Sequence, residues 1–335
     1  MTATITFDPL SKAADEARKT YFEQVGQATR TLVPYVYSDE IILAVRVALA
    51  TDRPLLLRGA PGSGKSTLAE DIAVVTGWRY YEQVVSSRTT AADLQWTFDA
   101  VQRLGDAQAR VEGVDITTRQ RYIQPGVLWW AFDPESARRR GLASEKPLTF
   151  PEAKDPAKSP PRTEAGAVVL LDEIDKAEPD MPNDLLVPMG AKRFRVTEAE
   201  VEVTAKSRVL LVITTNGERE LPPAFLRRCI VLKLEQPQGR ALNRILHVHF
   251  PEKDFPSLRD ETFVKIRGRF WAMVDAANRA GVRPPGTAEL IDAVRALATL
   301  PEAKEKWEAL SLATMWKHPD APELEDAESP AQGSA

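Results

Sequence analysis

The sequence predicts an α/β fold, in which helices sandwich a parallel β-sheet, followed by an all-helical C-terminal domain. Short apolar runs separated by helical segments recur at residues 55–57, 80–85, 168–171, 209–213 and 230–234. Continuous apolar strands that alternate with helices are typical of a parallel sheet covered on both faces. From Gly239 onward these runs stop and apolar residues recur at helical spacing, which predicts a second, helical domain.

Composition excludes several classes of protein. The 335 residues, 43% hydrophobic and 27% charged, match globular proteins and not disordered or fibrous chains. Lys and Arg number 44 against 48 Asp and Glu, so no basic excess indicates a nucleic-acid partner. The single cysteine, Cys229, cannot form an internal disulfide, which favours a reducing compartment. Because the N-terminus lacks a signal-peptide pattern and no apolar run of about 18 residues occurs, we expect a cytoplasmic protein without membrane insertion.

The N-terminal elements precede the first strand. Residues 1–32 are expected to form an extension built on a polar helix over 8–30, in which Tyr21, Phe22 and Val25 make a narrow apolar stripe. A second helix begins after Ser38, a good N-cap residue followed by two acids, and leads into the strand at 55–57.

Two stretches interrupt the alternation of strands and helices. Residues 89–140 read as an insertion, and of its adjacent Trp129 and Trp130 we expect one ring in the core and one on the surface. The basic triplet 138–140 is expected to be a solvated helix face. Residues 151–163 contain four prolines and mixed charges, which predicts an exposed, flexible loop with little fixed structure.

The helical domain is assigned to residues 237–317. One of its helices is expected to end at Gly281 and another to begin at Thr287. His247 and His249 have no further His or Cys ligand nearby, so we expect packing or surface roles and not zinc binding. The tail is assigned to residues 318–335. From Pro319 onward it holds five acids and no base, which is typical of a disordered segment. The core domain between extension and helical domain is then 33–236.

A glycine-rich pattern, G-x-x-x-x-G-K-[ST], lies between the first strand and the following helix. In this context the backbone N–H groups of the loop point at phosphate, the lysine reaches the terminal phosphates and the serine is placed to bind Mg²⁺. The expected nucleotide-binding residues are therefore Gly59, Ala60, Pro61, Gly62, Ser63, Gly64, Lys65, Ser66 and Thr67.

Two carboxylates follow the apolar strand at 168–171. Strand ends are where open α/β sheets bind ligands, so Asp172 is expected to join Ser66 in holding Mg²⁺. Glu173 is expected to polarise the attacking water, because hydrolysis needs a positioned base. Alone, the pair would read equally well as a solvated strand end. Asp175 is interpreted as a helix-cap residue.

Polar and basic side chains follow the next strand. Asn216 is placed to hydrogen-bond the attacking water or the terminal phosphate, whereas Asn216-Gly217 is also an ordinary turn signal. Arg227 and Arg228 end a short helix, where arginines commonly complement the helix dipole. The sharper interpretation is an arginine finger presented to a neighbouring subunit, with Arg228 favoured over Arg227.

Taken together, these segments resemble the AAA+ ATPases, and within them the MoxR-type group, over about residues 33–300. The resemblance rests on five segments: the phosphate loop, LLDEIDKA from Leu170, NDLLVPMG from Asn183, ITTN ending at Asn216, and LPPAFLRRC from Leu221. The resemblance implies a hexameric ring, hairpin inserts near 90–130 and 194–205 that face the channel or the partner, and a lid with a sensor arginine. Arg283 lies upstream of the place expected for that sensor, which proline or glycine occupies. Residues 35–37 would contact the base and ribose, or belong to the core.

The leading hypothesis is a ring-forming ATPase that uses ATP and Mg²⁺ to remodel or activate a protein client, in MoxR-type systems commonly together with a von Willebrand factor A domain protein. An ATP-gated switch or scaffold with slow turnover is the alternative. A stand-alone kinase is disfavoured, because it has no need of Glu173, Asn216 and Arg228. Stable nucleic-acid binding is not expected.

Overall fold

The computed structural model describes residues 7–25, 35–109, 115–158, 166–256, 258, 260–300, 302–303 and 305–320. The chain divides into two compact units. The first unit comprises residues up to Leu32, Tyr37–Arg58 and Ser66–Lys233; the second comprises Val33–Val36, Gly59–Lys65 and Leu234–Ala335. Among the described residues, no helix combines the length and the apolar character that crossing a bilayer requires.

The first unit is built around a five-stranded sheet with strand order β2-β5-β8-β1-β9, in which all neighbouring strands are parallel. Its strands are β1 (Leu55–Arg58), β2 (Arg79–Val84), β5 (Gly166–Asp172), β8 (Arg208–Thr215) and β9 (Ile230–Lys233). The five predicted strands and their parallel pairing are therefore confirmed. Ile213 and Thr214 of β8 lie opposite Leu171 of β5 and Leu57 of β1, respectively. The strands β1, β5 and β8 therefore end at the same edge of the sheet.

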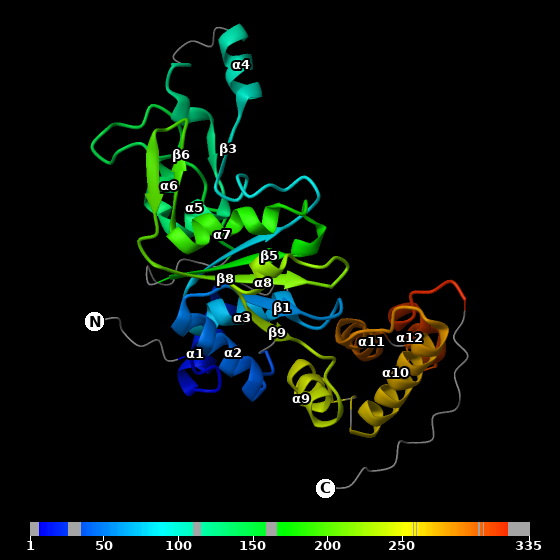
Figure 1. The fold of residues 1–335 in the computed structure, drawn as a ribbon. Coiled ribbons are helices and arrows are strands. Elements are labelled where there is room, and N and C mark those ends of the chain that lie inside the picture. Colours follow the sequence, from blue (N-terminus) through cyan, green and yellow to red (C-terminus); the bar gives the residue numbers. More distant parts are fainter. Residues whose placement is uncertain are drawn as a thin grey trace. The chain divides into compact units, whose positions relative to one another are not determined.

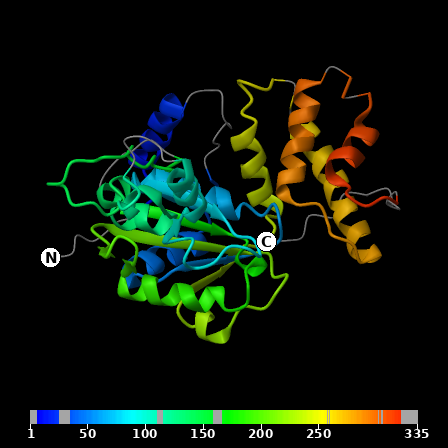
Figure 2. The ribbon, with the colours of Figure 1, turned by 90° about the horizontal axis from the view of Figure 1, so that it is seen from above.

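Helices cover both faces of this sheet (Figures 1 and 2). On one side lie α1 (Lys12–Val25), α2 (Asp39–Thr51) and α3 (Lys65–Thr76); on the other lie α5 (Val127–Phe132) and α7 (Met181–Ala191). The short helices α6 (Pro134–Arg138) and α8 (Pro223–Leu226) and the 3₁₀ turns η1 (Arg119–Tyr122) and η2 (Ile174–Lys176) complete this part. Ser38 caps α2 as predicted, its hydroxyl accepting the Ile41 N–H.

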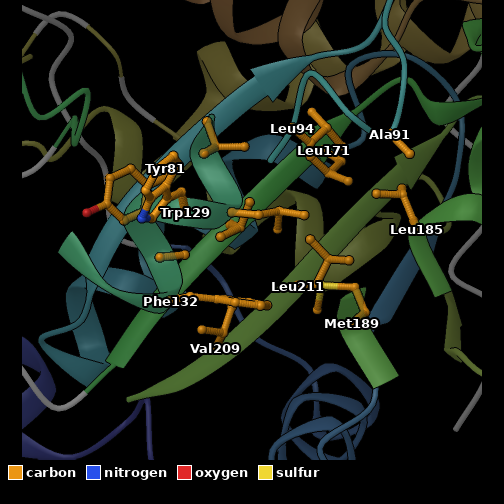
Figure 3. Close-up of a cluster of buried hydrophobic side chains, with 14 of the residues drawn as sticks. Tyr81, Ala91, Leu94, Trp129, Phe132, Leu171, Leu185, Met189, Val209 and Leu211 are labelled. Carbon is orange, nitrogen blue, oxygen red and sulfur yellow. The ribbon is translucent and has the colours of Figure 1, made fainter. Parts of the chain in front are cut away.

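Every residue of α5 is buried in a core of mostly apolar side chains (Figure 3). Trp129 and Trp130 are 0% and 1% exposed, so the expectation that one ring would lie on the surface was wrong. The reason is that α5 contacts β2, β5 and β8 on one side and strand β7 (Val201–Thr204) on another. Trp129 packs edge-on against Phe194, with ring centroids 6.3 Å apart.

Two antiparallel hairpins extend from the core. The first pairs β3 (Trp96–Phe98) with β4 (Ile123–Pro125) and carries α4 (Ala100–Ala109) between its strands. The second pairs β6 (Arg193–Val196) with β7. In that second hairpin Val196 and Val203 are buried, so these apolar side chains face inward.

One further expectation held in part and another was wrong. Residues 151–158 form a loop that is largely exposed, as predicted, but it is fixed against the edge strand β2, because the Lys158 N–H donates to the Tyr80 carbonyl at 2.9 Å and Ala153 is buried; residues 159–165 lie outside the described residues. The basic triplet, by contrast, does not form the solvated helix face that was expected. Arg139 donates to three carbonyl oxygens between residues 142 and 146, and Arg140 is 9% exposed beside the Phe150 ring.

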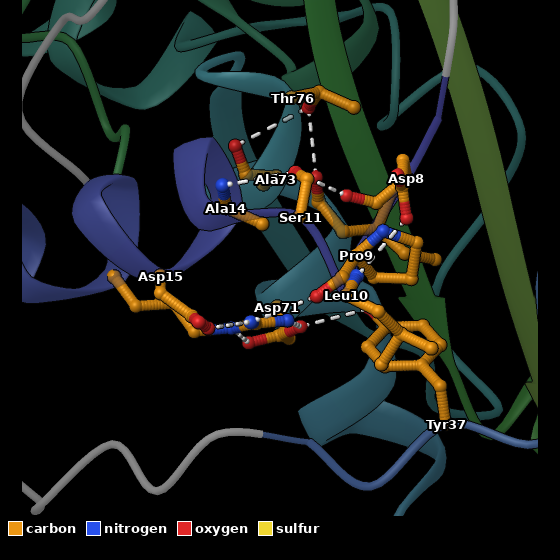
Figure 4. Close-up of polar contacts among 12 residues, drawn as sticks. Asp8, Pro9, Leu10, Ser11, Ala14, Asp15, Tyr37, Asp71, Ala73 and Thr76 are labelled. Atoms are coloured by element: carbon orange, nitrogen blue, oxygen red, sulfur yellow. Dashed lines mark hydrogen bonds and ion pairs between the residues drawn. The ribbon is translucent and has the colours of Figure 1, made fainter.

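A buried ion pair joins α1 to α3 (Figure 4). Nε and Nη2 of Arg18 donate to the two oxygens of Asp71 at 2.9 and 2.8 Å, and the Tyr37 hydroxyl donates to the same carboxylate at 2.8 Å. The Asp71 side chain is fully buried, as is most of Arg18. The N-terminal helix is thus attached through a specific, desolvated contact to the helix that follows the phosphate loop.

The second unit contains four helices among its described residues, α9 (Gly239–His249), α10 (Asp260–Ala280), α11 (Thr287–Thr299) and α12 (Trp307–Met315). Their apolar faces form one core that includes Leu246, Phe270 and Leu290. Gly281 ends α10 with a φ of +66°, a conformation that glycine adopts without strain, as predicted. Most of the acidic tail, residues 321–335, lies outside the described residues.

Candidate functional site

The phosphate loop, Gly59–Lys65, folds back on its own lysine. Lys65 is 7% exposed, and its ammonium donates to the carbonyl oxygens of Gly59 at 2.7 Å and Ala60 at 3.0 Å. Gly62 and Gly64 have φ values of +80° and +86°, which residues with a side chain rarely adopt. The glycines of the motif therefore permit the tight turn that a phosphate-binding loop needs.

Close packing explains the other glycine of the loop. A Cβ on Gly59 would lie 2.6 Å from the Leu234 carbonyl oxygen, and one on Gly64 would lie 3.2 Å from the Tyr35 ring. Of the aromatic residues expected to contact the base and ribose, Tyr35 thus lies beside the loop. Tyr37 is a core residue, 5% exposed and bonded to Asp71.

Hydroxyl and carboxylate oxygens converge at the edge of the sheet where β5 and β8 end. The Ser66 hydroxyl donates to Oδ2 of Asp172 at 3.0 Å, and the Thr214 hydroxyl donates to Oδ1 of the same carboxylate. Oxygen donors of this kind are the ligands of Mg²⁺, which takes one or two protein carboxylates and completes its shell with waters and phosphates. Among the described residues, no three His, Cys, Asp or Glu side chains form a group that could hold a metal ion. Ser66 and Asp172 therefore fit the predicted metal role.

Both carboxylate oxygens of Glu173 and its backbone N–H have partners. Its φ is +62°, an uncommon conformation for a residue with a side chain, and its N–H donates to the Thr214 hydroxyl at 2.9 Å. The Lys176 ammonium lies 2.7 Å from Oε2, and Nδ2 of Asn216 lies 3.4 Å from Oε1. The structure thus brings together Glu173 and Asn216, which the sequence separates by more than forty residues.

Asp175 is no helix-cap residue, contrary to the prediction. It lies in η2, 4% exposed, and its Oδ2 accepts the backbone N–H groups of Asn216 at 3.2 Å and Glu218 at 3.0 Å. It therefore ties the turn after β5 to the loop after β8. Sequence reasoning also missed Thr214, whose signal was a polar residue near the end of an otherwise apolar strand.

The candidate finger residues are exposed on the surface of the first unit. Arg227 and Arg228 follow α8, and the Arg228 guanidinium donates to the Ala224 carbonyl at 3.3 Å. Among the described residues, no hydrogen bond joins either arginine to the network around Asp172. The next residue, Cys229, is buried, and burial raises the pKa of its thiol to about 12, against a smaller lowering by Arg53. The thiol is therefore protonated at neutral pH.

Arg283 is engaged by a carboxylate in the second unit. Its guanidinium lies 2.8 Å from Oε1 of Glu289, whose Oε2 accepts the Gly286 N–H at 3.1 Å and so caps α11. A Cβ on Gly286 would lie 2.9 Å from the Pro61 carbonyl oxygen. The start of α11 therefore lies directly against the phosphate loop, while Arg283 itself is half exposed.

Comparison with known proteins places this site in a family. Residues 54–229, more than half of the chain, match the AAA domain of the dynein-related subfamily. Among solved structures, 89% of the chain aligns with 74% of a candidate ATPase from Cytophaga hutchinsonii ATCC 33406, at 14% identity and a TM-score of 0.38. No curated protein matches the sequence. The matched segment begins at the strand before the phosphate loop and ends at Cys229, so it spans Lys65, Asp172, Asn216 and Arg228. The chain belongs to the AAA domain family, in its dynein-related subfamily.

Proposed function

We propose that the protein is a MoxR-type AAA+ ATPase that hydrolyses ATP, assembles into a homo-oligomeric ring and uses the cycle to remodel or activate a protein partner. One observation carries the proposal: Asp172 and Glu173 share the Thr214 hydroxyl, and Glu173 also contacts Asn216. A metal-binding carboxylate and a second carboxylate paired with an amide are what hydrolysis by water requires.

Each residue then has a defined role. The loop residues 59–67 hold the phosphates of ATP, and Ser66 and Asp172 hold Mg²⁺, which neutralises charge on the phosphate oxygens. Glu173 accepts the proton of the attacking water through a carboxylate oxygen. Asn216 orients either that water or the terminal phosphate. Because a kinase transfers phosphate to a bound hydroxyl and excludes water, the pairing of Glu173 with Asn216 favours hydrolysis.

Assembly is proposed from the exposed arginines. We favour Arg228 over Arg227 as the residue that would reach the terminal phosphate of ATP bound to a neighbouring protomer. Such an arginine finger raises the rate of hydrolysis by about 10³ to 10⁵. A hexamer is the oligomer we expect from the resemblance, with hairpins β3–β4 and β6–β7 on its channel or on the surface that binds the client. The client is proposed to act with a von Willebrand factor A domain protein, and the buried thiol suits a reducing compartment such as the cytoplasm.

The domain division proposed from the sequence is an extension over 1–32, a core over 33–236, a lid over 237–317 and a tail over 318–335. In the lid, Arg283 would contact nucleotide only after exchanging its ion pair with Glu289. We therefore regard Arg283 as a weaker candidate than Arg228 for contacting the nucleotide.

ATP turnover per protomer, measured over a wide range of protein concentrations, tests the proposal. A steep rise with concentration that Arg228→Ala abolishes supports a ring with a shared site. Flat turnover that Glu173→Gln and Lys65→Ala both eliminate would instead indicate a self-contained site, and slow turnover with tight ATP binding would favour the switch. If Lys65→Ala leaves ATP binding unchanged, the nucleotide site itself has been assigned wrongly.

A further inference from the structure

Lys176 contacts the proposed base in a way that the roles above do not use. The 3₁₀ turn η2 returns the chain onto Glu173: the Lys176 N–H donates to the Glu173 carbonyl at 3.0 Å, and its ammonium lies 2.7 Å from Oε2 of the same residue. Backbone and side chain of Lys176 therefore both engage Glu173.

We propose that Lys176 is a positioning residue for Glu173, setting the direction in which that carboxylate faces the attacking water. The inference rests on the proposed ATPase function and concerns the same site. The Glu173 backbone is already fixed by its N–H bond to Thr214, but its side chain has three rotatable bonds beyond that anchor. Lys176 and Asn216 hold the far end of the side chain, one on each carboxylate oxygen.

This clamp orients the carboxylate and leaves it able to take a proton. An ionised carboxylate has about four lone-pair sites, and Lys176 and Asn216 occupy one on each oxygen. The remaining sites can accept a hydrogen bond from water. A base held in a productive geometry gives faster proton transfer than one that samples several rotamers, because the cost of orientation has already been met in the folded protein.

The ion pair between Lys176 and Glu173 is expected to contribute little to the stability of the fold. The Lys176 side chain is 44% exposed and that of Glu173 is 30% exposed, and ion pairs near solvent are screened and contribute little to folding. Its hydrogen bond to Glu173, together with the charges of Glu173, Glu218 and Asp175, raises the pKa of Lys176, which stays charged near neutrality. An effect of Lys176 should therefore appear in catalysis and not in unfolding.

The chain offers a matched control. Lys158 makes an ion pair with Glu82 at 2.5 Å, in which the side chains are 54% and 20% exposed. The pair lies at the edge strand β2, and among the described residues Lys158 has no hydrogen bond or ion pair to those assigned to ATP or Mg²⁺. Lys158→Met thus removes the same ammonium from a comparable exposed pair outside the site.

The experiment compares steady-state ATPase kinetics of the full chain and its variants. We expect Lys176→Met to lower kcat about tenfold, since misplacing a reacting group by about 1 Å costs up to 10²-fold. KM for ATP and the melting temperature should stay within twofold and within about 2 °C of wild type, given how little exposed pairs stabilise. Lys176→Arg should recover most of kcat, and Lys158→Met should behave as wild type.

A second measurement shows whether Lys176 acts through Glu173. In single-turnover assays with radiolabelled ATP, Lys176→Met should add no further loss to Glu173→Gln, because the side chain being positioned is already impaired. Equal losses in both backgrounds, an unchanged kcat, or a raised kcat in Lys176→Met would overturn the inference. These outcomes differ from failure of the proposed function, in which the wild-type chain itself would show no ATP turnover that depends on Lys65.

Discussion

The carboxylate of Asp175 accepts the backbone N–H of Asn216 at 3.2 Å, so the residue two positions after the proposed base holds the end of β8, which Asn216 follows. The same oxygen takes the N–H of Glu218 at 3.0 Å. Its partner oxygen, Oδ1, is buried and has no hydrogen-bond partner among the described residues. The loops after β5 and β8 are therefore joined through one buried carboxylate, independently of Thr214.

Replacing that carboxylate should destabilise the protein. Asp175→Ala leaves two partly buried N–H groups without their acceptor, and we expect the free energy of unfolding to fall by about 1–3 kcal/mol. Asp175→Asn retains one acceptor oxygen and should lose less. Urea denaturation followed by tryptophan fluorescence measures both. Equal stability of wild type and Asp175→Ala would show that the two N–H groups find other acceptors.

The packing of α11 on the phosphate loop predicts an effect on nucleotide affinity. In Gly286→Ala the new methyl group would lie 2.9 Å from the Pro61 oxygen and 3.0 Å from Oε2 of Glu289, so the helix start must shift away from the loop. We expect ATP to bind several-fold more weakly, as measured with a fluorescent ATP analogue.

Gly268→Ala is the control for that change. Gly268 lies inside α10, where an added methyl group meets no described atom within 4 Å. Alanine there should leave ATP affinity unchanged and raise stability by up to about 1 kcal/mol, because glycine is a poor helix former. A loss of affinity in both variants would mean that the helical unit as a whole, and not the Gly286 contact, limits binding.

The buried pair between Arg18 and Asp71 should respond differently to single and double substitution. Arg18→Met leaves a buried carboxylate without its counter-ion and should cost about 3–5 kcal/mol. The double variant Arg18→Met, Asp71→Leu removes both charges and should be less destabilised than the sum of the two single variants. Chemical denaturation of all four proteins measures this coupling, and additive losses would contradict it.

His249 predicts sensitivity to acid. Burial, with a smaller contribution from the Arg295 charge, lowers its pKa to about 4, from an ordinary value of 6.5. The unfolded chain therefore takes up a proton between pH 6.5 and pH 4 that the folded chain excludes, so this residue reduces stability as the pH falls through that window. The melting temperature of His249→Gln should fall less between pH 7 and pH 4.5 than that of the wild type. Parallel curves for the two proteins would show that His249 is not the group responsible.

Local patterns were sufficient for the strands and for the phosphate loop. An apolar run followed by glycines and a lysine needs only neighbouring residues to be interpreted, and the parallel order of the sheet then brings Ser66 to Asp172. Thr214 and Asp175 could not be predicted in the same way. Their roles depend on the register between β5 and β8, which fixes which strand ends meet and which no local spacing contains.

The errors have a similar origin. Trp130 and Arg140 were assigned from average behaviour of their residue types, whereas both are buried by segments distant in sequence. The prolines of residues 151–163 suggested a loose loop. Proline restricts the backbone, however, and the Lys158 N–H donates to the Tyr80 carbonyl on the edge strand β2. In each case a long-range contact decided the outcome.

The second unit joins Gly59–Lys65 to Leu234–Ala335, and this discontinuity bears on how the protein is made. A ribosome releases Gly62 more than two hundred residues before Gly286, which at roughly 5–20 residues per second is a delay of some tens of seconds. Throughout that interval the nascent loop lacks the helix that packs against it. A chain terminated before residue 286 would therefore carry the whole glycine-rich motif without the helix that packs against it.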